Sequence, residues 1–289
     1  MDITIVTHAE LPAGAVDDQL LAAALRRFGL DVRFAVWNDQ DTDWTITPLT
    51  LIRSTWDYFR RQPEWFSWLN TVHSKTALQN SAELVLWNSD KRYLMDLSAK
   101  GIRCIPTVFA PKGGKLLLGE VCRQNEWHDI VVKPSMAASA FGARRFSGMS
   151  IETSGEAHFQ HLLRNGDALV QPYLREVETL RERSLVFVSG SFAHAYTKQA
   201  FNANSTGSST IERYMATDDE IAFASAALSA CTEEPLYARV DLLPGENGPV
   251  LMELELIEPD LALRLVPATA DLFAESCHKL VRSLRDRVV

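Results

Sequence analysis

Blocks of basic residues and long apolar runs are both missing from this chain of 289 residues. The formal net charge is −8 and the Lys and Arg residues are scattered, which argues against nucleic acid or an anionic membrane as the main partner. No window reaches the ~18 apolar residues of a membrane span. The first residues carry an acid early, unlike a signal peptide. We therefore expect a cytoplasmic protein.

Cysteine is scarce and shows no metal-binding or redox spacing. None of the four cysteines belongs to a C-x-x-C pair, so a disulfide framework or a zinc site has little support. The first apolar run continues as VTHAELPAG, which lacks the G-x-G-x-x-G fingerprint of an NAD-dependent dehydrogenase. We find no Ser-His-Asp or Cys-His arrangement for covalent catalysis either.

The N-terminal part shows the strand, helix, strand pattern of an open parallel sheet. Residues 2–7 are a β-branched run, residues 16–30 place apolar side chains at helical spacing, and residues 31–37 predict another strand. Ligands of such sheets bind beyond the carboxyl ends of the strands. His8 and the segment 53–58 fall at these ends and are therefore candidates for a binding site.

The character of the chain changes near Asn88. A capped helix is predicted over residues 88–102, and later segments alternate between strands, a helix and a hairpin turn at residues 189–191. The fold class that follows is α/β (α+β). We expect three parts: an N-terminal α/β part over residues 1–86, a central lobe over residues 87–170 and a C-terminal, mainly antiparallel lobe over residues 171–289.

A polar segment interrupts the C-terminal lobe. Residues 199–213, QAFNANSTGSSTIER, have no periodic apolar face and predict a long loop. Long loops inside compact domains are often lids. We expect this one to close over a bound intermediate and exclude water.

Acidic residues gather near the end of the sequence. Glu253 and Glu255 alternate by two on a predicted strand, and a tight hairpin places Asp241 on its neighbour. Carboxylates converging on one face repel one another unless a cation neutralises them, and oxygen ligands suit Mg²⁺. The alternative is an ordinary half-buried strand with its glutamates in water. Arg239, two residues before Asp241, pairs these acids or holds a phosphoryl oxygen.

Lysines occupy the ends of several predicted elements. Lys91 lies at a helix start, Lys133 at the end of one strand and Lys198 at the end of another. A triphosphate needs several cations, and these can only be gathered from different segments. After Lys133, the run of small residues that includes Ser135 and Gly142 lets the backbone approach phosphates. It is not a Walker loop, since no G-K-[ST] closes it.

The order of these features resembles the ATP-grasp superfamily, in its glutathione-synthetase-like branch. The resemblance covers nearly the whole chain and rests on four segments in this order: NSDK, VVKPSMAASAFGARRF, VQPYLREVETLRERSLVFVSGSFAHAYTK and YARVDLLPGENGPVLMELELIEPDLAL. It implies an ATP-grasp fold, in which two lobes sandwich ATP. It also implies an ATP-dependent ligase that uses Mg²⁺ and passes through an acyl phosphate.

The resemblance also implies roles for individual residues. The nucleotide would be held by Lys91, Lys133 and Ser135, with adenine against the backbone of Gln171 and Leu174 and the ribose on Glu178. Lys198 and Arg239 would stabilise the transferring phosphoryl group. The magnesium ligands would be Asp241, Glu253 and Glu255. Many relatives have Asn at the third ligand position, and most have more glycine than the single Gly142 in the phosphate loop.

The segments HAELP and IRSTWDYF are similar to the N-terminal region of a subgroup that includes the cycloserine-forming ligase, which cyclises O-ureido-serine. Its substrate is small and amino-acid-like. Arg53 would bind the substrate carboxylate through its planar fork, Asp57 an amino or ureido group, and His8 is a further substrate-binding candidate.

Two alternatives stay open at this stage. The chain could join two separate molecules, as an amino-acid or dipeptide ligase, or it could be a regulatory protein that binds ATP without turnover. The complete set of lysines and carboxylates argues against the second. The oligomeric state is open as well, a homo-oligomer included.

Overall fold

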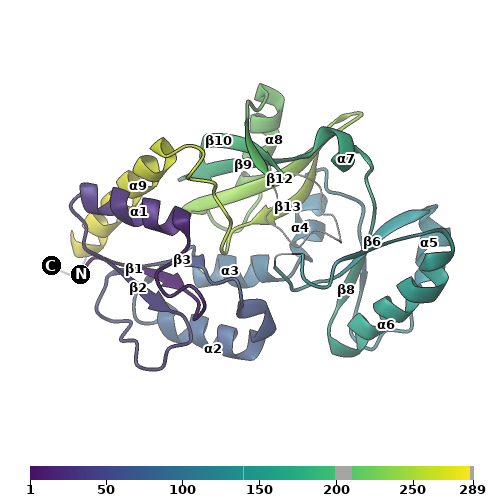
Figure 1. The fold of residues 1–289 in the computed structure, drawn as a ribbon, viewed down its shortest axis with the longest axis horizontal. Helices are drawn as coiled ribbons and strands as arrows, with labels where there is room; N and C mark the ends of the chain where they lie inside the picture. The colour runs from purple at the N-terminus through teal and green to yellow at the C-terminus, as the bar shows by residue number, and fades with distance from the viewer. Residues whose placement is uncertain (139, 199–209, 287–289) are drawn as a thin grey trace.

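The computed structural model describes residues 1–138, 140–198 and 210–286. Its strands form three sheets. The N-terminal sheet lies at the lower left of Figure 1, the five-stranded sheet lies above it and towards the centre, and the sheet of the central segment lies at the right. The predicted α/β class is confirmed. No helix in the described ranges is long and apolar enough to cross a membrane.

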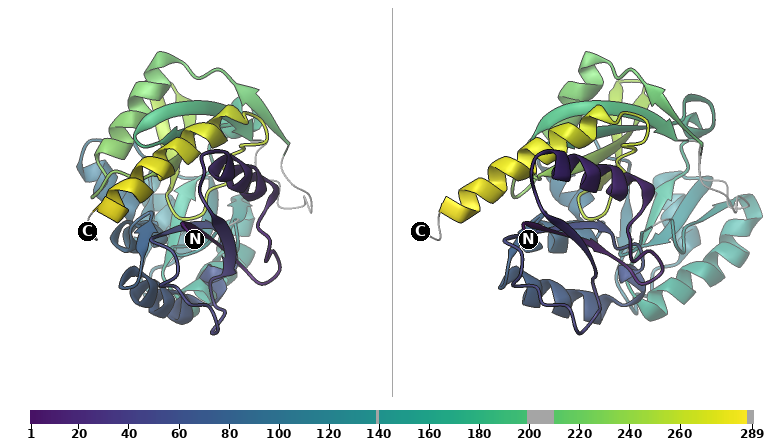
Figure 2. Two further views of the ribbon diagram at one scale, coloured as in Figure 1. Left: turned by 90° about the vertical axis from the view of Figure 1, so that its left-hand side faces the viewer. Right: turned by 60° about the vertical axis from the view of Figure 1, so that its left-hand side comes forward.

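The N-terminal sheet is wholly parallel, with strand order β2-β1-β3-β4, as the strand, helix, strand pattern predicts. Its strands are β1 (Ile3–Thr7), β2 (Val32–Val36), β3 (Leu49–Ser54) and β4 (Ala77–Gln79). One face packs against the apolar sides of α1 (Val16–Arg27) and α9 (Ala268–Asp286). Figure 2 shows α9 running beside α1 although the two helices come from opposite ends of the sequence.

The other face of this sheet is covered by α2 (Gln62–His73) and α3 (Ala82–Ser89). Its core is rich in tryptophan: Trp37, Trp44, Trp65 and Trp68 pack edge to face or stacked. The short helix η1 (Tyr58–Arg60) follows β3 and adds two buried aromatic rings. These large contacts fix the end of β3, which carries the predicted substrate residues.

The sheet of the central segment is antiparallel, with strand order β5-β8-β6-β7. Its strands are β5 (Val108–Ala110), β6 (Asp129–Pro134), β7 (Arg144–Ser147) and β8 (Ala168–Pro172). The core of this sheet includes residues of α5 (Leu118–Asn125), the π-helical turn η3 (Ile151–Gly155) and α6 (Glu156–Asn165). The turn η2 (Gly148–Ser150) links β7 to them.

The five-stranded sheet is antiparallel, with strand order β11-β10-β9-β12-β13. Its strands are β9 (Glu182–Val188), β10 (Ser191–Lys198), β11 (Ile211–Tyr214), β12 (Tyr237–Gly245) and β13 (Gly248–Glu255). One face packs against α4 (Tyr93–Ala99) and α8 (Asp218–Ser229), and α7 (Glu176–Leu180) precedes β9. The opposite face is apolar only at the end that meets α9. Its other end carries charged side chains.

Two sequence expectations differ from the structure. The helix predicted from Asn88 is two helices, because α3 ends at Ser89 and α4 begins at Tyr93. The predicted loop 199–213 ends in a strand, since β11 pairs with the otherwise open edge of β10. Residues 199–209 of that loop, and with them most of the predicted lid, lie outside the described residues. The threefold division of the chain stays a prediction, and its boundaries fall within α3 and β8.

Candidate active site

The predicted acids share one face of the five-stranded sheet. In the antiparallel register of β12 and β13, Asp241 lies opposite Glu253, and Arg239 lies opposite Glu255. The intervening Leu254 is buried on the other face, which agrees with the period of two. Glu253 and Glu255 retain about a third of their side-chain exposure, at 32% and 30%, so they face a partly open region rather than bulk water.

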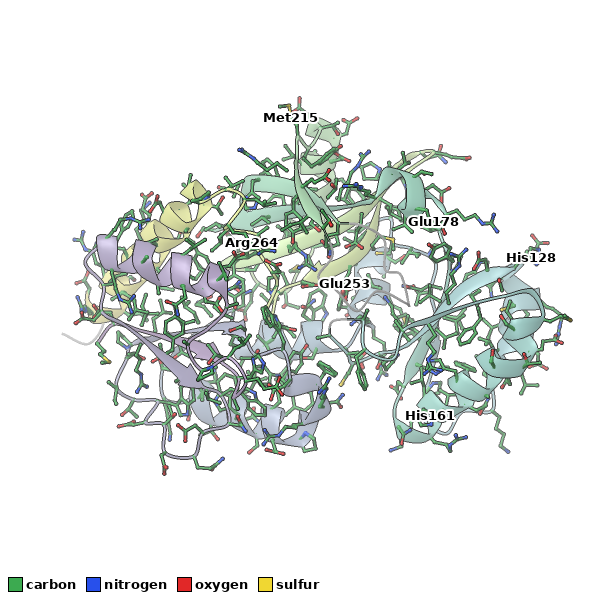
Figure 3. The ribbon with its side chains drawn as sticks, viewed as in Figure 1. His128, His161, Glu178, Met215, Glu253 and Arg264 are labelled. Carbon is green, nitrogen blue, oxygen red and sulfur yellow. The ribbon has the colours of Figure 1, made fainter. Side chains whose placement is uncertain are left out.

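Each of these acids has a cationic partner. Arg239 pairs with Asp241, Nη2 to Oδ2 at 2.8 Å, and also with Glu255. Lys198 Nζ lies 2.9 Å from Asp241 Oδ2. Lys91 Nζ lies 3.1 Å from Glu253 Oε1. The predicted lysines and acids are therefore neighbours in space, and Figure 3 shows Glu253 near the centre of the molecule.

The electrostatics of this face follow from burial and crowding. Burial raises the pKa of Glu255 to about 7, with Asp241 and Glu253 adding to the rise and Arg239 opposing it. Burial and Arg239 act to lower the pKa of Lys198, but nearby carboxylates outweigh them and hold it above its ordinary value. Perturbed groups of both signs on one face are typical of functional sites.

Sequence reasoning missed two acids of this cluster. Glu182, at the start of β9, pairs with Lys198 at 2.6 Å. Glu258 follows β13, and burial together with the Glu255 carboxylate raises its pKa to about 8. Glu182 lies two residues before Ser184, whose hydroxyl donates to Asp241 Oδ1 at 2.6 Å. That period of two on β9 is the signal that could have found Glu182.

The link between α3 and α4 joins this face to the phosphate loop. Lys91 donates from Nζ to the carbonyl of Ala137 at 2.7 Å and from its backbone N–H to the carbonyl of Ser135 at 3.0 Å. Ser135 is itself buried. Lys133 lies on β6 just before this loop, and burial lowers its pKa while Glu253 and Glu182 oppose the change. The loop is thus held by the first of the predicted phosphate-binding lysines.

Asn88, in the same NSDK segment, fixes the edge strand β13. Its Nδ2 donates to the carbonyl of Leu254 at 2.8 Å, and its Oδ1 accepts from the N–H of Leu256 at 2.9 Å. This buried amide and the hydroxyl of Tyr93, which accepts from the N–H of Leu254 at 3.0 Å, therefore replace a strand neighbour at this end of β13. This holds Glu253 and Glu255 in position.

The predicted nucleotide-binding residues lie along β8 and α7. The buried side chain of Gln171 donates to Thr107 Oγ1 at 2.9 Å, and the Leu174 carbonyl accepts from the N–H of Val177 as α7 begins. Glu178 on α7 accepts from Tyr173 Oη at 2.9 Å and from Arg145 at 2.8 Å. These two hydrogen bonds lower the pKa of Glu178. Figure 3 shows Glu178 on the side of the five-stranded sheet that faces the central sheet.

The predicted substrate residues lie at the carboxyl end of the N-terminal sheet. His8 Nδ1 is 2.7 Å from the carbonyl of Ser54, which joins β1 to β3. Asp57 Oδ1 accepts from Trp37 Nε1 at 2.7 Å. Arg53 is buried, with its Nε 3.3 Å from Asp18 Oδ1. All three side chains therefore make contacts within the protein.

Some polar atoms at this strand end have no hydrogen-bond partner among the described residues. They are Arg53 Nη1, Ser54 Oγ and Thr55 Oγ1. Buried donors of this kind cost free energy unless another group satisfies them. A polar ligand that reaches this strand end would satisfy them. Arg53 Nη2 is already taken by the carbonyl of Pro259, at 2.8 Å.

The donor set on the acidic face fits Mg²⁺ by its chemistry. Mg²⁺ takes oxygen ligands and is usually bound by one or two carboxylates together with substrate phosphates. Asp241 and Glu253 are opposite each other on one face, which meets that need. In the described part of the chain no three His, Cys, Asp or Glu side chains form a ready metal cluster. The carboxylates are instead compensated by Lys and Arg.

Known proteins share this architecture. Residues 3–80 match the family described as "D-cycloserine synthetase DcsG, N-terminal domain". The "Cycloserine biosynthesis protein DcsG" of Streptomyces lavendulae is 32% identical over 290 residues, which cover 95% of this chain and 97% of that protein. The crystal structure of D-cycloserine synthetase DcsG superimposes with a TM-score of 0.89 at 30% identity, over 97% of this chain and 100% of that one.

More distant structures share the fold alone. D-alanine–D-alanine ligase from Bacillus anthracis gives a TM-score of 0.70 at 16% identity, with both chains covered completely. A RimK domain ATP-grasp protein from Sphaerobacter thermophilus gives 0.71 at 15% identity, over 96% of this chain and 99% of the other. The ATP-grasp fold expected from the sequence is confirmed.

Proposed function

The chain belongs to the family of D-cycloserine synthetase DcsG, among the ATP-grasp ligases, and we propose that it closes a C–N bond within O-ureido-serine at the expense of ATP. The relatives point to a cycloserine-forming reaction, and the resemblance of the N-terminal segments HAELP and IRSTWDYF supports O-ureido-serine as the substrate. The observation that carries the reaction type is the face of the five-stranded sheet where Lys91, Lys198 and Arg239 meet Asp241 and Glu253.

The reaction has two steps. A carboxylate oxygen of the substrate attacks the γ-phosphorus of ATP, and ADP leaves. A nitrogen then attacks the acyl carbon, phosphate leaves and the nitrogen loses a proton. Both steps depend on alignment and on neutralising charge, and no nucleophilic side chain is needed.

The residues divide this work by position. Lys91 and Lys133 hold the phosphates, with Ser135 at the base of the loop, and Lys198 and Arg239 stabilise charge on the transferring phosphoryl group. The adenine lies against the backbone of Gln171 and Leu174, and the ribose hydroxyls bind Glu178. Mg²⁺ bound through Asp241, Glu253 and Glu255 would supply the remaining positive charge.

The substrate binds between the N-terminal sheet and this face. The NH2 group of Arg53 Nη1, which has no partner among the described residues, would donate to the carboxylate. His8 and Asp57 line the same strand end and contact the polar end of the substrate. The position of Asp57 is fixed by the Trp37 indole, so its carboxylate does not need to be oriented by the substrate.

The proposal is tested by measuring ADP release and product mass with Mg²⁺, ATP and O-ureido-serine. We expect ADP and a cyclic product that is lighter than the substrate by at least one water. A heavier product from two amino acids would identify a ligase that joins two molecules. Binding of ATP without ADP release, for every amino-acid and ureido compound tried, would identify a non-catalytic protein and contradict the proposal.

A further inference from the structure

Residues 258–264 connect β13 to α9 and touch both the N-terminal sheet and the five-stranded sheet. Three consecutive carbonyls in this segment accept hydrogen bonds from side chains of other elements. The pairs are Trp56 Nε1 to Glu258 O at 3.1 Å, Arg53 Nη2 to Pro259 O at 2.8 Å, and Arg239 Nη1 to Asp260 O at 3.2 Å.

These contacts come from two different sheets. Trp56 and Arg53 follow or end β3, whereas Arg239 lies on β12. Tyr196 on β10 also donates to the carbonyl of Asp260, at 2.7 Å. A displacement of residues 258–264 therefore moves the carbonyl acceptors of Arg239 and of Arg53 together.

Asp17 and Arg264 fix the segment in its conformation. Asp17 is buried in the first turn of α1, and its carboxylate accepts from the N–H of Leu263 at 2.7 Å and of Arg264 at 3.1 Å. The Arg264 guanidinium lies 3.0 Å from Asp17 Oδ2 and forms two hydrogen bonds of 2.9 Å with the Asp260 carboxylate. Figure 3 places Arg264 between α1 and the five-stranded sheet.

We propose that Asp17 and Arg264 are positioning residues for ligation, which set Arg239 and Arg53 relative to each other through the carbonyls of residues 259 and 260. Neither side chain touches the reacting atoms. Arg239 also pairs with Asp241 and Glu255, so its hydrogen bond to Asp260 selects one direction for its guanidinium among several acceptors. This inference rests on the proposed function, in which Arg239 stabilises the transferring phosphoryl group and Arg53 binds the substrate carboxylate.

The alternative is that Asp17 and Arg264 only stabilise the fold. The two readings differ in what a substitution changes. A purely structural contact alters the free energy of unfolding and leaves the turnover of each folded molecule unchanged. A positioning contact alters turnover and the amount of product per ADP, because a misplaced acyl phosphate reacts with water instead of the nitrogen.

The experiment compares Arg264→Met with Arg27→Met in the full-length chain. Arg27 is a matched control, because its ion pair with Asp271 also joins α1 to α9 and does not touch residues 258–264. For Arg264→Met we expect kcat to fall by about 10-fold to 10²-fold, the order of effect of a displacement near 1 Å. The KM for ATP should stay within about 2-fold, and less product should form per ADP. Arg27→Met should keep wild-type values.

Further variants keep the test decisive if Arg264→Met fails to fold. Arg264→Lys retains the charge and loses the planar fork, so it should give an intermediate kcat. Asp17→Asn retains one acceptor and should lower product per ADP in the same direction. Wild-type kcat and wild-type product per ADP in the folded variants would overturn the inference. Absence of ADP release from the unsubstituted protein would instead count against the proposed function.

Discussion

The charged face of the five-stranded sheet and the end of β3 in the N-terminal sheet differ in how their polar groups are satisfied. On the charged face, Asp241 and Glu253 are paired with Lys and Arg side chains. At the end of β3, donors on Arg53, Ser54 and Thr55 have no partner in the described part of the chain. The first region must exchange ion pairs to bind a ligand, whereas the second can bind one by satisfying groups that the protein leaves free.

This difference suggests separate functions for the two regions. Ion pairs that can be exchanged suit a polyanion and its metal, because each lysine can move to a phosphate while its carboxylate moves to the cation. Free donors on one arginine and two hydroxyl groups suit a small substrate that carries a carboxylate. If a change made in one region alters the binding of both nucleotide and substrate, the two regions do not have separate functions.

The largest effect is expected from removing divalent metal. EDTA should abolish ADP release, and Mg²⁺ should restore it, since the triphosphate carries more charge than the lysines compensate. The midpoint of thermal unfolding should stay the same, because Lys and Arg already neutralise the carboxylates. A large fall of this midpoint in EDTA would show that the fold depends on metal, and it would contradict the assignment of ion pairs on this face.

Glu253→Gln tests one carboxylate of the charged face. It removes a proposed metal ligand and the partner of Lys91, and turnover should fall by about 10²-fold, as for loss of one electrostatic stabiliser. Glu246→Gln is the control, since Glu246 is exposed in the turn of the same hairpin. Near-wild-type kcat in Glu253→Gln would remove Glu253 from the metal site.

His194 on β10 provides a stability test of a buried group without an ionic partner. Burial lowers its pKa to about 4, and the backbone carbonyl of Leu261, which favours the protonated ring, opposes the shift. The unfolded state therefore binds a proton first as the pH falls. The free energy of unfolding should decrease between about pH 6.5 and pH 4, by about 3 kcal/mol at most, and recover as the pH rises.

This contribution is measured by urea unfolding at several pH values. His194→Gln should lose the His194 part of the pH dependence, whereas substitution of the exposed His73 by Gln should leave it in place. An unchanged pH dependence in His194→Gln would show that other groups cause it.

The smallest effect is expected at Thr55. Thr55→Val removes a buried hydroxyl without a described partner, so the free energy of unfolding should rise by about 1 kcal/mol. If the substrate uses this hydroxyl, its KM should rise by about 2-fold to 10-fold while the KM for ATP stays constant. Thr50→Val, on β3 shortly before Thr55, is the control, and it should destabilise the fold, since Thr50 Oγ1 donates to Thr76 Oγ1. A stabilised Thr55→Val with unchanged KM would place the substrate elsewhere.

The acids of the charged face could be predicted from the sequence because their spacing is visible within one hairpin. The period of two fixes the side of Glu253 and Glu255, and a tight hairpin brings Asp241 opposite. The lysines were predicted from their positions at the ends of predicted helices and strands and from the ATP-grasp resemblance. Glu182 escaped notice because β12, the neighbour of β9 that carries Asp241, is distant in sequence, although the hairpin partner β10 is not.

The surroundings of the substrate region were beyond sequence reasoning. The contacts of Arg53 with Asp18 and Pro259 join residues 35 and 206 positions apart. Asn88 replaces a strand neighbour of β13 through contacts that span more than 160 positions. Such hydrogen bonds leave no periodic pattern, and no motif marks them. The contacts of residues 258–264 could not be predicted, since nothing local shows which side chains their carbonyls accept from.

The central claim is that the ion pairs of the charged face give way to nucleotide and metal. A crystal structure with Mg²⁺ and a non-hydrolysable ATP analogue tests it directly. We predict that Lys91 Nζ leaves Glu253, from which it is now 3.1 Å away, and contacts a phosphate oxygen while Glu253 binds the metal. A bound analogue whose phosphates lie away from an intact Lys91–Glu253 pair would contradict the account.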